Sequence, residues 1–265
     1  MIIANWLTAA WSYRGFIRSS IANDYRTRYA RSRVGTAWIM LQPLAQSLIF
    51  ALVLADVLAA RMQGIPNRYG YAVYLMAGML CWSLFSEILT RCISVFVDNA
   101  NLLRKMRFPR IALPAIVIGS AIVANVAFAC VVLIAAPLLG FPLSTNWLWL
   151  PALGALTGLL AASFGLAIGI VNVFARDAGQ VAGVALQFLY WATPIVYPAS
   201  IVPAGMKTVL RLNPLTPLVE SYQSVIVYGR GPSAGLWSTV LIALVMTLVS
   251  AFLFRRASPE LVDAL

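Results

Sequence analysis

The chain has 265 residues, of which 62% are hydrophobic and 10% charged, and its formal net charge is +11. Soluble domains carry about 25% charged residues, so this composition excludes an ordinary soluble domain and indicates one integral membrane domain. The cations flank apolar runs instead of forming a basic face, which favours membrane topology over nucleic-acid binding.

The first 35 residues are too charged to cross a bilayer. Aromatic residues alternate with arginines there, a composition typical of an amphipathic helix at the membrane interface. We therefore predict an interfacial helix on the cytoplasmic side over residues 1–35. Its expected interfacial residues are Trp6, Trp11, Arg14, Arg18, Arg26 and Arg28.

Six apolar runs follow, and we interpret each as a membrane-spanning helix, because about 20 apolar residues cross the hydrocarbon core. The predicted spans are about 36–60, 71–95, 111–139, 147–174, 179–196 and 234–254, of which the fifth is short. The third and fourth come from one uncharged run that divides at Gly140, Pro142 and Asn146, which favour turns. Residues 36–256 thus form the membrane domain, and 257–265 a cytoplasmic tail.

The distribution of cations predicts the orientation. An even number of spans places both termini on one side of the membrane. Six cations precede the first span, five lie between residues 91 and 110, one is Arg176, and two follow the sixth span, against five in the opposite loops. The positive-inside rule therefore places both termini in the cytoplasm.

The cytoplasmic loop after the second span contains "NLLRKMRFPRIALP", residues 101–114, in which cations alternate with apolar residues. The pattern over 99–108 predicts a short amphipathic helix that ends before Pro109. Two roles remain open from these residues alone. The helix either lies on the lipid headgroups or docks a cytoplasmic partner.

The stretch Tyr197–Pro232, between the fifth and sixth predicted spans, holds five of the fourteen prolines. Its segment "PLVESYQSVIVYG" is apolar enough to enter a bilayer but too short to cross it. We predict a pair of re-entrant half-helices on the outer side, which a membrane tolerates only where protein or a water-filled cavity shields the broken backbone. An exposed loop is the alternative.

Residues that carry enzyme chemistry are scarce. The sequence has no histidine, no cysteine spacing suited to zinc, no GxSxG motif and no GxxxxGK[ST] phosphate loop. We therefore expect no metal, no cofactor and no ATP hydrolysis by this chain. The main intramembrane ionisable residues are Glu87 and Arg91, whose four-residue spacing predicts a pair on one helix face.

Five segments, taken in order, resemble one protein family. They are "DYRTRYARSRVGTAWIMLQPL" (Asp24–Leu44), "NANLLRKMRFPRIALP", "NVFARDAGQV" (Asn172–Val181), "ATPIVYP" (Ala192–Pro198) and "LNPLTPLVESYQ" (Leu212–Gln223). They resemble membrane subunits of ABC-2 type exporters of polysaccharides and polyol phosphates. The resemblance covers roughly Asp24 to Arg256, with Val34 at a position where leucine is usual.

The resemblance implies an all-α, six-helix permease of the inner membrane that forms a homodimer and binds two copies of a separate ATPase chain. Its substrate would be a lipid-linked polysaccharide such as O-antigen, capsule or teichoic acid, with O-antigen the favoured candidate. The resemblance also favours the docking role for the loop. The expected ATPase-coupling residues are Leu102, Leu103, Arg104, Lys105, Met106, Arg107, Phe108 and Pro109.

Aromatic side chains offer flat surfaces on which sugar rings can stack. The predicted glycan conduit comprises Tyr71, Tyr74, Trp82, Phe85, Phe188, Tyr190, Trp191 and Tyr197. The alternative for those near the outer interface is an ordinary aromatic belt. Two other functions stay open: an ABC-2 exporter of drugs or small lipids, and a membrane-embedded transferase acting on lipid-linked glycans.

Overall fold

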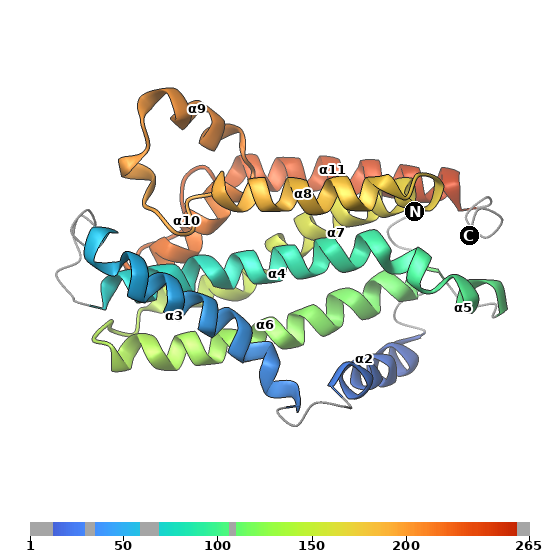
Figure 1. Ribbon diagram of the computed structural model, residues 1–265, viewed down its shortest axis with the longest axis horizontal. Helices are drawn as coiled ribbons and strands as arrows, with labels where there is room; N and C mark the ends of the chain where they lie inside the picture. The colour runs from blue at the N-terminus through green and yellow to red at the C-terminus, as the bar shows by residue number, and fades with distance from the viewer. Residues whose placement is uncertain (1–12, 30–34, 59–68, 106–109, 259–265) are drawn as a thin grey trace.

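The computed structural model describes residues 13–29, 35–58, 69–105 and 110–258, and every regular element in these ranges is a helix (Figure 1). In chain order the elements are α2 (Arg14–Tyr29), η1 (Gly35–Ala37), α3 (Trp38–Leu58), α4 (Gly70–Asp98), α5 (Ala100–Lys105), α6 (Ala112–Leu138), η3 (Thr145–Trp149), α7 (Leu150–Phe174), α8 (Asp177–Trp191), η4 (Ala199–Ile201), α9 (Ala204–Leu212), α10 (Leu215–Ile226) and α11 (Leu236–Ala257).

Four segments of the described chain are long and apolar enough to cross a membrane. They are α4, α6, η3 together with α7, and α11, and they correspond to the predicted spans 71–95, 111–139, 147–174 and 234–254. The predicted spans 36–60 and 179–196 correspond to α3 and α8, which are not among these four. With 15 residues, α8 is about 22 Å long, shorter than the hydrocarbon core of about 30 Å.

Helix α4 forms the centre of the bundle and is the most buried of the four candidate spans. It packs closely against α7 because glycines of α7 face it. A Cβ atom at Gly169 would lie 2.5 Å from the carbonyl oxygen of Cys92, and one at Gly165 would lie 2.7 Å from the Cys92 Cβ. Only glycine allows the two backbones to approach this closely, as small residues commonly do between membrane helices.

The turn after α6 is also determined by glycine. Gly140 has a φ of 90°, in the left-handed region that other residues rarely adopt. Its N–H donates to the Pro137 carbonyl, and the N–H of Phe141 donates to the Ala136 carbonyl at 3.0 Å. These bonds satisfy the last carbonyls of the helix, so α6 ends where the predicted division of the uncharged run lies.

Several arginines gather at one end of the bundle, and we call it the basic end. Arg104 on α5, Arg110 before α6, Arg176 before α8 and two arginines of α11 lie there (Figure 1). Nη1 of Arg110 donates to the Ser258 hydroxyl at 2.8 Å, which joins the start of α6 to the end of α11.

Two short helices lie between α8 and α11 at the opposite end. Helix α10 is buried against α4, α7 and α11, whereas α9 projects from the bundle (Figure 1). The alternative of an exposed loop is therefore wrong for Leu215–Ile226. Whether the two helices re-enter a membrane stays a prediction.

Helix α2 lies along the basic-end half of α6 (Figure 1). Ile21 occupies the space beside Gly119, where an added Cβ would lie 2.5 Å from the Ile21 Cδ1, and the Tyr25 hydroxyl donates to the Ser120 carbonyl. Arg14, Arg18 and Arg26 are exposed. The predicted interfacial residues Trp6 and Trp11, and the side chain of Arg28, lie outside the described residues.

The predicted coupling helix corresponds to α5, which covers only Ala100–Lys105. Arg104 is exposed, but Leu103 is only 8% exposed and belongs to the chain's own core. Leu103 therefore packs inside this chain, Leu102 is half-buried, and contact of either residue with a partner stays a prediction. Met106, Arg107, Phe108, Pro109 and the side chain of Lys105 lie outside the described residues.

Candidate functional site

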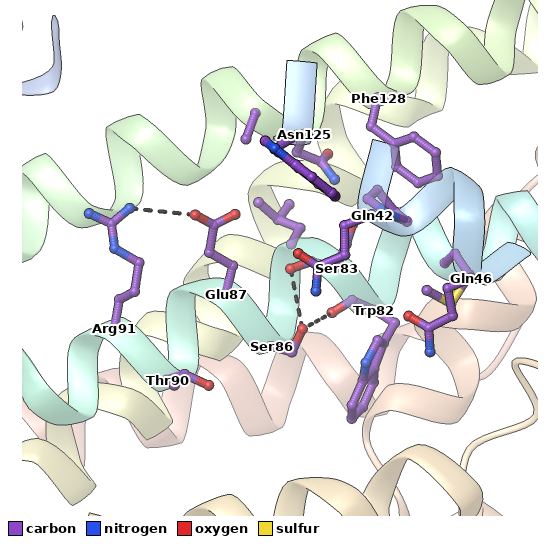
Figure 2. Close-up of a pocket in the computed structure, with 15 residues that line it drawn as sticks. Gln42, Gln46, Trp82, Ser83, Ser86, Glu87, Thr90, Arg91, Asn125 and Phe128 are labelled. Atoms are coloured by element: carbon purple, nitrogen blue, oxygen red, sulfur yellow. Dashed lines mark hydrogen bonds and ion pairs between the residues drawn. The ribbon is translucent and has the colours of Figure 1, made fainter. Parts of the chain in front are cut away.

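A cavity of about 620 Å³ lies between α3, α4 and α6, and we call it the polar cavity (Figure 2). Its lining residues are Trp38, Gln42, Pro43, Gln46, Met79, Trp82, Ser83, Leu84, Ser86, Glu87, Thr90, Arg91, Ala124, Asn125 and Phe128. About half of these lining residues have polar or charged side chains, although α4 and α6 are apolar enough overall to cross a membrane.

The α4 wall of the polar cavity is a stripe of polar residues. Ser83, Ser86, Glu87, Thr90 and Arg91 recur at intervals of three and four and thus lie on one helix face. The spacing of this stripe is visible in the sequence, but sequence analysis identified only Glu87 and Arg91. The helical period within an apolar run was the signal that would have revealed the rest.

The α3 and α6 walls add amide side chains. Gln42 and Gln46, one helical turn apart on α3, face the stripe, and Asn125 reaches it from α6 (Figure 2). The Asn125 Nδ2 donates to the Leu80 carbonyl at 2.9 Å, so it also ties α6 to α4. Sequence analysis missed these three residues. The four-residue spacing of Gln42 and Gln46 on α3 was a local signal, whereas nothing in the sequence connects Asn125 of α6 to them before the fold brings the helices together.

The depth of the polar cavity indicates its role. Arg91 lies 7 positions and Ser83 lies 15 positions before the end of α4 at Asp98, which is about 10 to 22 Å along the helix at 1.5 Å per residue. Polar side chains at such depth face a bundle interior or a water-filled space, because hydrocarbon cannot hydrogen-bond to them. The polar cavity is therefore suited to hold water or a hydrophilic solute.

Arg91 joins three helices at the basic end of the polar cavity. Its Nη2 donates to Asp24 Oδ2 on α2 at 2.8 Å, and its Nη1 donates to the Ser120 hydroxyl on α6 at 2.5 Å. Its Nη1 also lies 3.5 Å from Glu87 Oε1, so the predicted Glu87–Arg91 pair is present (Figure 2). Sequence analysis did not identify Asp24 as the nearer partner, because the two residues are 67 positions apart.

Of the eight aromatic residues predicted to form a conduit, only Trp82 lines the polar cavity. Phe85 is 4% exposed and packs in the core, although its ring centroid is only 6.1 Å from that of Trp82. Two residues three positions apart differ by about 60° around a helix, and the edge of the cavity falls between them. Tyr190 of α8 packs edge-on against Trp82 at 5.1 Å, behind the wall.

Tyr71 and Tyr74 contact the chain's own backbone in this structure, and their place in a conduit stays a prediction. Both rings are buried, and their hydroxyls face the non-helical segment after α8. The Tyr71 hydroxyl donates to the Val196 carbonyl at 3.0 Å, and the Tyr74 hydroxyl lies 3.4 Å from the Tyr197 carbonyl. These contacts provide hydrogen-bond donors for the Val196 and Tyr197 carbonyls, which backbone N–H groups would bond if the segment were helical.

The same segment receives further side-chain donors. Gln223 Nε2 donates to the Pro194 carbonyl at 3.1 Å, and Asn213 Nδ2 donates to the Ala192 carbonyl at 3.3 Å. The Tyr197 hydroxyl donates to the Trp191 carbonyl at 2.7 Å. The end of α8 is therefore supported by α4 and by residues at and before α10.

Two aromatic residues of the predicted conduit lie on the surface of this chain. Phe188 is 74% and Trp191 59% exposed on α8, and neither lines the polar cavity. Phe50 of α3 contacts both the Tyr190 and Trp191 rings, with centroids 6.4 Å apart in each case. This aromatic group joins α3 to α8 away from the polar stripe.

The family model described as "ABC-2 type transporter" matches residues 17–227, a range that includes the whole lining of the polar cavity. The chain belongs to the ABC-2 type transporter family. It is thus a membrane transport protein, as the sequence resemblance implied.

Known relatives of this ABC-2 transporter chain align with most of its length. A Myxococcus xanthus protein named O-antigen export system permease protein RfbA is 28% identical over 265 residues, covering 96% of this chain and 97% of the relative. A Klebsiella pneumoniae protein of the same name is 25% identical, covering 88% of each chain. An Escherichia coli polysialic acid transport protein, KpsM, is 24% identical, covering 80% of this chain and 81% of the relative.

Proposed function

We propose that this ABC-2 chain is the membrane subunit of an exporter that moves a lipid-linked polysaccharide, of the O-antigen type, out of the cytoplasm. The observation that carries the proposal is the polar cavity of about 620 Å³ inside an apolar bundle. Sugars carry many hydroxyls, and Ser, Thr, Gln and Asn side chains can exchange hydrogen bonds with them at each step of a passage. The names of three relatives that match over most of the chain support a polysaccharide as the substrate.

Six spans are part of this proposal. Helix α3 would add a span, and α8 would do so together with the segment that follows it. A non-helical backbone at membrane depth is tolerated where protein shields it, and Tyr71, Tyr74 and Gln223 supply that shielding through the carbonyls of residues 194–197. The basic end then faces the cytoplasm by the positive-inside rule, and α9 and α10 lie on the outer side.

Energy for export comes, in this proposal, from a separate ATPase subunit, two copies of which bind a homodimer of this chain. The sequence has no phosphate loop of its own. Helix α5 follows directly after the basic end of α4. A force applied at α5 would reach the polar stripe through α4, because α4 carries the stripe and leads into α5.

An exporter of drugs or small lipids is the second candidate function. Such solutes favour pockets lined mainly by apolar side chains, whereas serine, threonine, amide and charged residues make up about half of the polar-cavity lining. The polar lining therefore favours the polysaccharide.

Reconstitution tests the proposal. Proteoliposomes that contain this chain and its co-expressed ATPase subunit should accumulate lipid-linked polysaccharide only when magnesium and ATP are supplied. The purified chain alone should show no hydrolysis above a mock preparation. ATP-driven uptake of a small lipid or drug without uptake of the polysaccharide would contradict the proposal.

A further inference from the structure

A second pocket, of about 590 Å³, lies between α2, the end of α4 with α5, and the start of α6. We call it the interfacial pocket, because one wall is the helix predicted to lie at the membrane interface. Its volume falls within the range of about 300–1,000 Å³ that is typical of sites for small molecules. Arg91 lines both this pocket and the polar cavity, so the two spaces adjoin at that residue.

The α2 wall of the interfacial pocket is polar. Ser20, Asn23 and Arg26, at intervals of three residues, all line it. None of their side chains has a hydrogen bond or ion pair with another residue that the structure describes, and Arg26 is exposed. A hydroxyl, an amide and a guanidinium therefore remain available as donors on one face of α2.

The charge balance of the pocket favours an anion. Two opposite charges, Asp24 and Arg91, pair with each other across 2.8 Å and largely neutralise one another. Arg26 is the cation in the lining that remains uncompensated among the described residues. Arginine binds phosphate through two parallel N–H donors, a stronger contact than a neutral hydrogen bond.

The opposite wall is formed by α4, α5 and α6 and is largely apolar, apart from Asn99 and the paired Arg91. Val95, Leu102, Leu113, Ile116 and Val117 line it. A free inorganic anion gains nothing from such a wall, whereas a hydrocarbon chain gains about 25 cal/mol for each Å² of apolar surface that it buries. A pocket with one cationic and one apolar wall matches an amphiphile with an anionic head.

We propose that the interfacial pocket binds the phosphate of a lipid phosphate ester, with Arg26 as its cation and the hydrocarbon chain against Leu113 and Ile116. Basic pockets between membrane helices on the cytoplasmic side hold lipid headgroups by this chemistry. Given the proposed export function, on which this step rests, the ligand is the phosphate that links the polysaccharide to its lipid. The pocket then holds the substrate beside the polar cavity before the sugar chain enters.

Direct binding to the purified full chain in detergent micelles tests the site. The probe is a fluorescent polyprenyl phosphate without sugar, followed by anisotropy. Arg26→Gln should weaken binding about tenfold, which corresponds to about 1.4 kcal/mol. The matched control is Arg18→Gln, since Arg18 is also an exposed arginine of α2 but does not line the pocket. Ile116→Ser should weaken binding through the apolar wall without removing a charge.

Competition separates the possible sources of the phosphate. Unlabelled polyprenyl phosphate should displace the probe at concentrations at least tenfold below those of phosphatidylglycerol or inorganic phosphate. Equal displacement by phosphatidylglycerol would overturn the assignment to the substrate lipid, and equal displacement by inorganic phosphate would overturn the role of the apolar wall. Equal affinities of Arg26→Gln and wild type, or equal losses in Arg26→Gln and Arg18→Gln, would overturn the site itself.

The assay also separates failure of this inference from failure of the proposed function. The probe carries no sugar and the measurement uses no ATP, so absent binding contradicts the site and leaves polysaccharide export untouched. Normal binding combined with unaltered surface polysaccharide in cells that lack the chain would contradict the export function alone.

Discussion

Arg91 of α4 donates from Nη2 to Asp24 Oδ2 of α2 at 2.8 Å, and this ion pair holds α2 to the centre of the bundle. The side chains are 19% and 26% exposed, so the pair is neither fully buried nor freely solvated. Exposed pairs contribute about 0–1 kcal/mol, and breaking a buried pair costs about 3–5 kcal/mol. We expect an intermediate value for this one.

Asp24→Asn should therefore lower the free energy of unfolding of the purified protein by about 1–2 kcal/mol. A double-mutant cycle with Arg91→Gln isolates the pair, and we expect a coupling energy of about 1 kcal/mol. The cycle of Asp24→Asn with Arg18→Gln serves as the control and should be additive. Additivity of the Asp24 and Arg91 substitutions would show that the pair does not hold α2 in place.

The contact of α4 with α7 gives a second prediction. Gly169→Ala places a Cβ atom 2.5 Å from the Cys92 carbonyl oxygen, a distance at which one backbone must move. We expect a loss of about 1–3 kcal/mol, as for other over-packed interiors. Thermal unfolding in detergent measures it. Gly183→Ala on α8 is the matched control, because an added Cβ there has nothing within 4 Å; equal melting temperatures for both variants would contradict the close packing.

The support of the non-helical segment after α8 gives a third prediction. Tyr71→Phe removes the donor to the Val196 carbonyl while keeping the ring. Leaving a buried carbonyl without its partner should cost about 1–3 kcal/mol. Tyr13→Phe, at an exposed position, should cost nothing measurable. If Tyr71→Phe unfolds at the wild-type temperature while polysaccharide export falls, Tyr71 would belong to the conduit after all.

The polar cavity gives a fourth prediction. The Ser86 hydroxyl donates to the Trp82 carbonyl of its own helix, so Ser86→Leu should narrow the cavity without breaking a contact between helices. We expect surface polysaccharide to fall severalfold, with the melting temperature nearly unchanged. Ser238→Leu on α11 is the control, because the Ser238 hydroxyl also bonds locally, to the carbonyl of Gly235 just before its helix, but is exposed. Wild-type export by Ser86→Leu would exclude this cavity from the path.

The helices could be predicted from the sequence because long apolar runs have few alternatives in a bilayer. The position of α4 was predicted as 71–95 and found as Gly70–Asp98. The division of the uncharged run was predictable because Gly140 carries a local conformational signal. Apolar runs and turn residues are local properties, so one sequence reveals them.

The candidate site was less predictable because its contacts are not local. Aromatic chemistry suggested Tyr71 and Tyr74 as conduit residues, but which side of α4 they face depends on the segment after α8 and on α10. The Asp24–Arg91 pair joins residues that no short motif connects. The polar stripe from Ser83 to Arg91 is the exception, since its helical period was present in the sequence.

The most direct test of the account is the location of the polysaccharide in cells depleted of this chain. Immunogold labelling with an antibody against the polysaccharide, combined with immunoblotting of intact and lysed cells, measures both pools. Depletion should remove the polysaccharide from the surface and accumulate it inside, attached to its lipid, and the wild-type chain should restore the surface signal whereas Ser86→Leu should restore it only partly. Normal surface polysaccharide after complete depletion, with no internal pool, would contradict the proposed export function.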